Sequence, residues 1–195
     1  MRPGLTLYKL QQEIKRQDPE ELDRMLAGFF CSLDRNVESF LKKNALLYER
    51  KGFGRSYLYI TDEPIPRIAA FFSVAITSTD FEKVSKTRKK KILSFDKPGV
   101  SAKDHFGGLL IGQLGRADGF GSADINGQEM IEAAEEIIES GRFFVGGRII
   151  YLDCSKDLIP FYQKNGYELV IDEPFSNAYY KMFKALPDIP ELSCT

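Results

Sequence analysis

The spacing of apolar side chains predicts two amphipathic helices in the first quarter of the chain. Asp18 is expected to cap the first helix, with Pro19 in the first helical position and apolar residues following at every third or fourth place. Asp34 is expected to cap the second helix, which then ends at Gly52. A weakly alternating segment at 5–10 precedes both helices and predicts a first strand.

Strand composition follows the helical region. Residues 56–61 and 68–76 are rich in aromatic and β-branched side chains, and the turn-forming segment 62–64 separates them. This pattern predicts an antiparallel hairpin. Two further apolar segments, 106–115 and 145–153, are also of strand length.

Two more helices are predicted between and after these strands. Residues 127–140 place apolar side chains on one face and glutamates on the other, and Gly141 is the expected terminator. A short helix follows, with Asp157 as the expected cap and Pro160 in the first turn, because a proline deeper in a helix removes a needed N–H. Its expected end is at Asn165-Gly166.

The order of elements predicts an α/β fold with a central mixed β-sheet flanked by helices. Strand and helix alternate in the second half, which favours parallel pairing there, whereas the hairpin is antiparallel. Residues 80–104 are polar and lysine-rich and are interpreted as a short helix and a long connection. Segments 167–171 and 178–183 predict closing strands, with a tail from about 184. We expect one domain over 1–195.

Composition narrows the class of protein. The chain has 195 residues, 43% of them hydrophobic, which suits a globular domain with its own core. The only histidine, His105, and three widely spaced cysteines (Cys31, Cys154 and Cys194) do not match a metal site or a disulfide framework. We therefore expect no bound metal. Since no membrane-length apolar run and no secretory signal are present, we expect a cytoplasmic protein.

Charge is distributed unevenly along the chain. Residues 1–100 contain 19 basic and 13 acidic residues, whereas residues 101–195 contain 8 and 15. The basic half includes the run Arg88, Lys89, Lys90 and Lys91, which could meet RNA phosphates. The run lacks interleaved aromatic residues, so a solvated loop is the competing interpretation.

Two segments carry candidate chemistry. In 116–127, glycines allow tight turns, and the segment leads into a helix N-terminus whose N–H groups can bind an anion; Asn126 is placed to cap that helix. An ordinary strand-to-helix connection explains this segment equally well. In the second segment, Phe161 is expected in the core, while the hydroxyl of Tyr162 could donate a proton to a leaving group. A half-buried structural tyrosine is the alternative.

The element order, the anion-suited loop and the segment FYQKNGY (161–167) resemble the Gcn5-related N-acetyltransferase (GNAT) superfamily. The resemblance implies a GNAT-like acyl-CoA N-acyltransferase fold, in which the strand at 106–115 leads into a pyrophosphate loop and the strand at 145–153 diverges from it. Acetyl-CoA would be the co-substrate. The family's loop motif is only partly matched here, because Ser122 to Asn126 stand where basic and glycine residues are usual.

The resemblance also implies roles for individual residues. Tyr162 would protonate the departing CoA thiolate, and Ser155 stands where the family often has a cofactor-binding asparagine. The residues implied in cofactor binding are Leu114, Gly115, Arg116, Ser122, Asp124, Ile125, Asn126, Gly127, Ser155 and Phe161. No residue is an obvious general base; Glu63, Asp153 and a chain of water molecules stay open as candidates, and His105 is expected to lie before its strand with a surface or packing role.

The function implied is acyl transfer: an N-acetyltransferase that moves an acetyl group from acetyl-CoA to a primary amine on a small molecule, a protein or an aminoacyl-tRNA. Two alternatives stay open. One is a catalytically weak or inactive GNAT-fold protein that binds CoA, which the degenerate loop favours. The other is a nucleic-acid-binding protein that uses the basic patch. A homodimer also stays open, and no membrane partner is expected.

Overall fold

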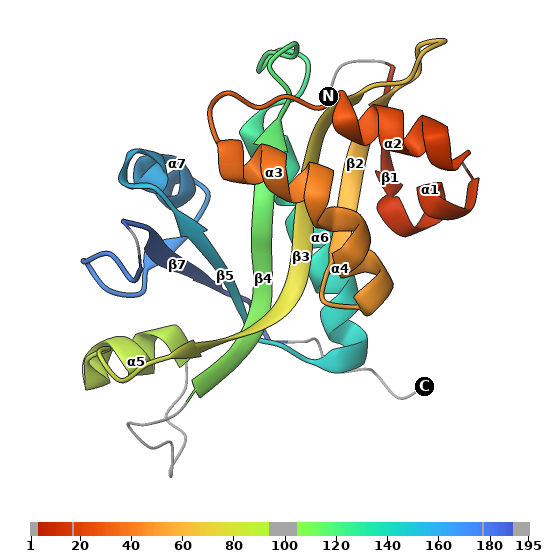
Figure 1. Ribbon diagram of the computed structural model, residues 1–195. Helices are drawn as coiled ribbons and strands as arrows, with labels where there is room; N and C mark the ends of the chain where they lie inside the picture. Colours follow the sequence, from red (N-terminus) through yellow and green to blue (C-terminus); the bar gives the residue numbers. More distant parts are fainter. Residues whose placement is uncertain (1–3, 17, 94–104, 177, 189–195) are drawn as a thin grey trace. The chain divides into compact units, whose positions relative to one another are not determined.

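In a computed structural model, residues 4–16, 18–93, 105–176 and 178–188 are described (Figure 1). Their strands form one mixed sheet of seven strands in the order β1-β2-β3-β4-β5-β7-β6. The strands are β1 (Leu5–Lys9), β2 (Arg55–Thr61), β3 (Ile68–Asp80), β4 (His105–Arg116), β5 (Ile149–Cys154), β6 (Glu168–Leu169) and β7 (Tyr180–Ala185). β2 and β3 form the predicted antiparallel hairpin, and β4 pairs with β5 in parallel. The mixed α/β sheet is therefore confirmed.

The first quarter of the chain contains more helices than the sequence pattern predicts. They are α1 (Leu10–Arg16), α2 (Pro19–Ala27), α3 (Arg35–Lys43) and α4 (Ala45–Lys51). Asp18 and Asp34 cap α2 and α3 as expected, accepting the N–H groups of Glu20 and Asn36, each at 2.8 Å. The prediction of one helix from Asp34 to Gly52 is wrong, because the chain bends at Asn44, which ends α3 and precedes α4. The segment that forms α1 has too few apolar residues for its period to be recognised.

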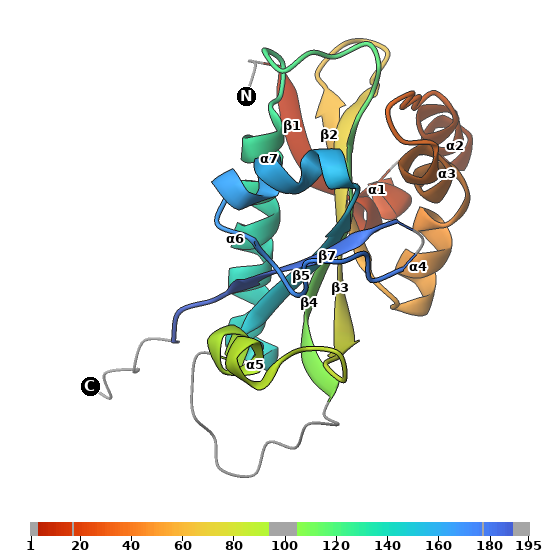
Figure 2. The same cartoon turned by 90° about the vertical axis from the view of Figure 1, so that its left-hand side faces the viewer.

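The contacts divide the chain into two compact units, and each is described by itself. Unit 1 comprises Met1–Ala75 and Ile111–Glu136. Within it, α1 to α4 lie on one face of β1, β2 and β3, and the first part of α6 (Gly127–Val145) lies on the other face (Figures 1 and 2). Its main core joins the four helices to Leu58 and Phe71 of the sheet, and both side chains are fully buried.

Unit 2 comprises Ile76–Leu110 and Ile137–Thr195. Its helices are α5 (Lys86–Leu93), the second part of α6, a 3₁₀ turn at Lys156–Leu158, and α7 (Ile159–Lys164). A core of apolar side chains joins α5 to β5 and β7 and includes Ile92, Tyr151 and Phe183. The short helix predicted at the start of 80–104 is confirmed as α5, while the long connection falls on 94–104, outside the described residues.

The end of α6 differs from the predicted one, whereas the end of α7 agrees with it. α6 continues through Gly141 and ends at Val145; the next residue, Gly146, has a φ of 77°, and its N–H donates to the carbonyl of Arg142 at 2.8 Å. Gly141 is not needed as a terminator, since the left-handed conformation that stops the helix occurs five residues later. Gly166, with a φ of 86°, follows α7 where the sequence predicts the stop.

The described helices include none that is both long and apolar enough to cross a bilayer. Within the same residues, no group of three or more His, Cys, Asp and Glu side chains is arranged to hold a metal ion. The expectation of a single domain over the whole chain stays a prediction.

Candidate functional site

The loop that joins β4 to α6 is held in shape by its own side chains. Arg116, the last residue of β4, donates from its guanidinium to the carbonyl oxygen of Ile125 at 2.8 Å. The carboxylate of Asp124 accepts the N–H of Gly121, also at 2.8 Å. The carbonyl of Gly121 in turn accepts the N–H groups of Asp124 and Ile125. These bonds close a compact turn immediately before the helix.

The first turn of α6 carries a reciprocal capping box. The side-chain oxygen of Asn126 accepts the N–H of Glu129 at 2.9 Å, and the carboxylate of Glu129 accepts the N–H of Asn126 at 3.1 Å. Such a box satisfies two of the N–H groups that a helix N-terminus leaves unpaired. The predicted capping role of Asn126 is confirmed, and Glu129 completes the capping box.

Only part of this loop can therefore bind an anion through its backbone. The N–H groups of Gly121, Ile125 and Asn126 already have partners within the protein. Four N–H groups have no hydrogen bond recorded within the part of the chain that the structure describes: those of Ser122, Ala123, Gly127 and Gln128. Of the residues expected to bind cofactor, Ser122 and Gly127 keep a free N–H, while Arg116 and Asp124 brace the loop.

Gly115 is required by close packing. A Cβ built at this position would lie 2.3 Å from Cγ1 of Val37, which belongs to α3. Real Cβ atoms do not approach other atoms so closely. Its neighbour Leu114 is half-buried. The glycine thus lets α3 pack directly against the end of β4 that enters the loop.

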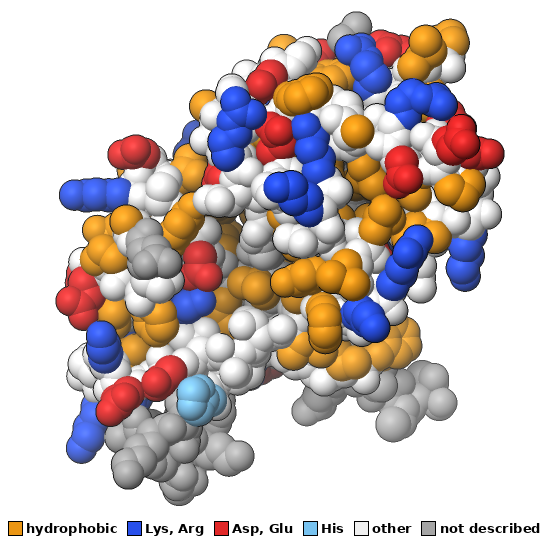
Figure 3. All heavy atoms as spheres, viewed as in Figure 1, with side chains coloured by type: hydrophobic (Ala, Val, Ile, Leu, Met, Phe, Trp, Pro, Cys, Tyr) orange, Lys and Arg blue, Asp and Glu red, His pale blue; other side chains and the backbone are white. Residues whose placement is uncertain are grey.

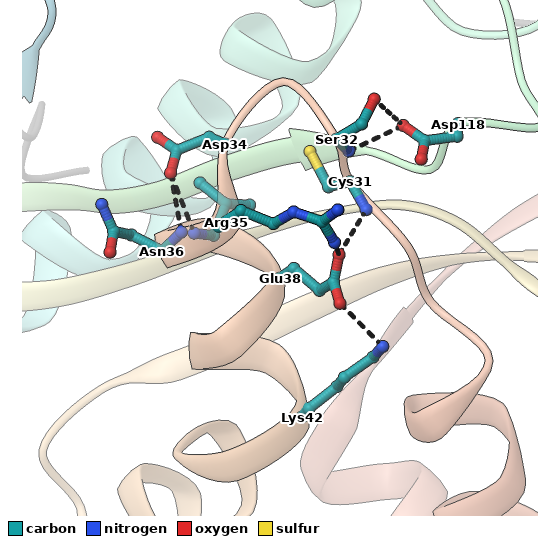
Figure 4. Close-up of polar contacts among 9 residues, drawn as sticks. Cys31, Ser32, Asp34, Arg35, Asn36, Glu38, Lys42 and Asp118 are labelled. Atoms are coloured by element: carbon teal, nitrogen blue, oxygen red, sulfur yellow. Dashed lines mark hydrogen bonds and ion pairs between the residues drawn. The ribbon is translucent and has the colours of Figure 1, made fainter.

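A hydrogen-bonded cluster that the sequence does not reveal lies beside this loop. Asp118 follows β4, and its carboxylate accepts both the N–H and the hydroxyl of Ser32, at 2.8 and 2.9 Å (Figure 4). Glu38 of α3 accepts the N–H of Cys31 at 3.0 Å and pairs with Lys42 at 2.9 Å. No local motif signals a contact between residues 86 positions apart. The result is a fixed connection between the α2–α3 loop and the loop after β4.

Tyr162, the predicted catalytic residue, lies on α7 in unit 2. Its ring is 7% exposed and packs edge-on against Phe161 and Tyr167, with centroid distances of 5.1 and 5.9 Å. Burial, and to a lesser extent the nearby Cys154, raises the pKa of the Tyr162 phenol well above its usual value. No hydrogen bond from its hydroxyl is recorded to any other described residue. The phenol therefore carries its proton at neutral pH.

Other expectations for the same segment need correction. Phe161 is half-buried, not a core residue. Ser155 is exposed, and its cofactor contact stays a prediction. Leu158, not Asp157, occupies the cap position of α7, and it makes no side-chain capping bond. A 3₁₀ turn before α7 places the cap one residue later than expected, and Pro160 still falls in the first turn.

The residues considered as a general base are already engaged or exposed. Glu63 holds the guanidinium of Arg67 through two nitrogens, and Asp153 pairs with Lys181 at 2.9 Å. His105 is exposed and begins β4, although it was expected before the strand. None of these residues is singled out as a base.

The basic run on α5 is largely engaged within unit 2. Arg88 and Lys91 both bind the carboxylate of Glu168, at 3.0 and 2.6 Å, and Arg88 also donates to a backbone carbonyl of β6. Lys89 is 8% exposed. Much of the positive charge that suggested an RNA contact therefore stabilises the packing of α5 on the sheet.

No family model and no curated protein matches this sequence. Solved structures do match it. A bacterial toxin aligns over 94% of this chain and 92% of its own, with a TM-score of 0.73 and 17% identity. AtaTR bound with acetyl-CoA gives a TM-score of 0.64 at 14% identity and 94% coverage of both chains. AtaT complexed with acetyl-methionyl-tRNAfMet gives 0.67 at 15% identity, covering 93% of this chain and 94% of its own.

The chain has the GNAT fold. The fold inferred by resemblance from the sequence is thus confirmed. Within this GNAT-fold protein, the residues expected at the site fall into two groups. Those from Leu114 to Gly127 gather at the end of β4 and the start of α6 in unit 1, and Ser155, Phe161 and Tyr162 gather around α7 in unit 2.

Proposed function

We propose that this protein is an N-acetyltransferase that moves an acetyl group from acetyl-CoA to a primary amine. The observation that carries the proposal is the β4–α6 loop of a GNAT-fold chain, which is rigidly closed and still offers four unbonded backbone N–H groups. A diphosphate is bound well by such groups at a helix N-terminus, because they donate hydrogen bonds and the helix dipole favours negative charge.

The N–H groups of Gly127 and Gln128 in the first turn of α6, together with those of Ser122 and Ala123, are the proposed donors to the diphosphate. The carboxylates of Asp124 and Glu129 already accept N–H groups of the loop, which partly neutralises their charge. Arg116 acts through the loop, because its guanidinium holds the carbonyl of Ile125.

In the proposed reaction the amine nitrogen attacks the thioester carbonyl, a C–N bond forms and the C–S bond breaks. A backbone N–H at the strand end Leu114–Arg116 is proposed to stabilise the negative charge on the carbonyl oxygen, a contribution of about 3–4 kcal/mol for comparable donors. Tyr162 is the proposed proton donor to the departing sulfur. Its buried phenol stays protonated until that step, although the raised pKa makes the transfer less favourable than for an exposed tyrosine.

The amine must arrive without its proton, because only the neutral form has a free electron pair.

Among the candidate acceptors, we propose more specifically an aminoacyl-tRNA. It is supported by the likeness to AtaT, which was solved with acetyl-methionyl-tRNAfMet. The homodimer stays a prediction.

The proposal is tested by incubating the protein with acetyl-CoA and a panel of small amines, peptides and aminoacyl-tRNAs. Mass spectrometry would detect acetylated product, and a thiol reagent would detect released CoA. We expect both signals together, in equal amounts, with at least one acceptor. Acetyl-CoA that neither binds nor reacts with any member of the panel would refute the proposal.

A second candidate function is CoA binding without catalysis. It is favoured by two carboxylates, that of Asp124 in the loop and that of Glu129 in the first turn of α6, which place negative charge beside the proposed diphosphate site. This candidate predicts that acetyl-CoA raises the melting temperature, because a ligand that binds only the folded state stabilises it, while no thiol is released with any amine.

A further inference from the structure

An exposed surface on unit 1 combines aromatic rings with positive charge. We call it the α4 surface; it consists of Lys43, Leu47, Tyr48, Arg50, Lys51 and Phe53. Hydrophobic side chains and neighbouring lysines or arginines are visible over α4 in Figure 3. The exposed fractions of its apolar members are 47% for Leu47, 38% for Tyr48 and 63% for Phe53.

The aromatic rings of the α4 surface are held in fixed positions. Gly52 adopts a φ of 74°, and the N–H of the next residue, Phe53, donates to the carbonyl of Tyr48 at 3.0 Å. This helix ending brings the two rings into edge contact, with centroids 5.7 Å apart. Tyr48 also contacts Phe40, whose ring stacks on the buried Phe71. The exposed pair is therefore anchored to the core.

The charge of the α4 surface is not balanced locally. In the described residues, no ion pair is recorded for the exposed Lys43, Arg50 or Lys51. The only acidic side chain between 43 and 53, Glu49, is buried and accepts the N–H of Ser56 at 2.6 Å. The α5 run differs, because there Arg88 and Lys91 bind Glu168.

Helix stability explains only part of this surface. Cations in the last turn interact favourably with the helix dipole, which accounts for Arg50 and Lys51. The same effect accounts for Lys43 in the last turn of α3, but it does not account for the exposure of Phe53 beside these cations. Aromatic faces beside unpaired cations are the combination that binds single-stranded nucleic acid, since bases stack on the rings and phosphates meet the cations.

We propose that the α4 surface binds single-stranded RNA, with a base stacked on Phe53 and phosphates contacting Lys43, Arg50 and Lys51. The inference rests on the proposed function in one respect: an aminoacyl-tRNA acceptor brings an unpaired RNA end to the enzyme. Binding itself requires no acetyl transfer, so the two proposals can fail separately.

The test measures fluorescence anisotropy of a labelled, unstructured RNA of about 12 nucleotides as a function of salt concentration. Phe53→Ala is expected to weaken binding at least about fivefold, which corresponds to the loss of one stacked base. Lys51→Ala is expected to reduce the slope of log affinity against log salt by about 0.7, the value for one phosphate contact to a single strand. Lys86→Ala on α5 removes another exposed lysine and is expected to change neither quantity.

Three outcomes would overturn the proposal. They are equal binding by all three variants, equal affinity for a duplex of the same length, and displacement of the RNA by an acidic peptide with no effect of Phe53→Ala. The last outcome would identify a protein partner. Acetylation of a small amine by the same variants, expected at the wild-type rate, separates loss of RNA binding from loss of the enzyme.

Discussion

Asp118 accepts two hydrogen bonds from Ser32, and thereby fastens the loop before α3 to the loop after β4. Asp118 also donates its own N–H to the carbonyl of Phe30 at 2.8 Å. The contact lies at the surface, yet it joins segments that are far apart in the sequence.

Replacing Asp118 with alanine should destabilise unit 1 by about 1 kcal/mol, because the two donors of Ser32 lose a charged acceptor but remain accessible to water. Chemical denaturation would measure the loss. Ser32→Ala removes only the hydroxyl donor and serves as the matched variant, with a smaller expected effect. A fully additive double variant would show that the two side chains do not interact.

Gly115→Ala should destabilise the protein by about 1–3 kcal/mol, since the new methyl group would overlap Val37. Thermal or denaturant unfolding would measure this. Combining the substitution with Val37→Ala creates room for the methyl group, so the double variant should lose less stability than the sum of the two single variants. Strict additivity would contradict the packing argument.

The fold could be predicted from the sequence more fully than the site. Features that depend on local chemistry could be predicted from the sequence. They are the apolar periodicity, the Asp18 and Asp34 caps, and the glycine after α7. The bend at Asn44 was not predicted, because tertiary packing of two short helices overrides a continuous helical pattern. The Ser32–Asp118 bond depends on the folded arrangement alone. The capping role of Asn126 was predicted, but the hydrogen bond from the N–H of Gly121 to the carboxylate of Asp124 was not.

Tyr162→Phe tests the role of the phenol in the proposed reaction. The turnover number should fall by roughly 100-fold, as expected when a general acid is lost, while the affinity for CoA stays unchanged because the ring packing is preserved. Steady-state kinetics and calorimetric titration would separate the two quantities. Equal turnover would remove Tyr162 from the mechanism. Because its pKa is raised above 10.0, the wild-type rate should show no loss attributable to this phenol below that pH.

Glu38→Gln should make the melting temperature depend less on pH in the acidic range. The N–H of Cys31 and then Lys42 hold the pKa of the Glu38 carboxyl down, from 4.5 to about 2. A lowered folded-state pKa stabilises the protein above the unfolded-state value, and this contribution disappears as pH falls through the folded-state value. The melting temperatures of wild type and variant should therefore differ most near neutral pH and converge between about pH 5 and pH 2. A constant difference would exclude the charge as its cause.

Cys154 should resist alkylation in the folded protein. Burial, and then the nearby Asp153, raises the pKa of its thiol to about 11, so little reactive thiolate is present at pH 8. Peptide mass spectrometry after iodoacetamide treatment would show slow labelling in buffer and rapid labelling in denaturant. Labelling of Cys154 at the same rate in both conditions would contradict its burial.

The turn closed by Arg116, Gly121 and Asp124 has a consequence for how a ligand would arrive. A segment whose bends are already secured by internal bonds loses little conformational entropy when something docks on it. A ligand would then bind to a preorganised loop, and diffusion and electrostatic attraction would set the association rate. The rate would not be limited by a rearrangement of the loop around the ligand.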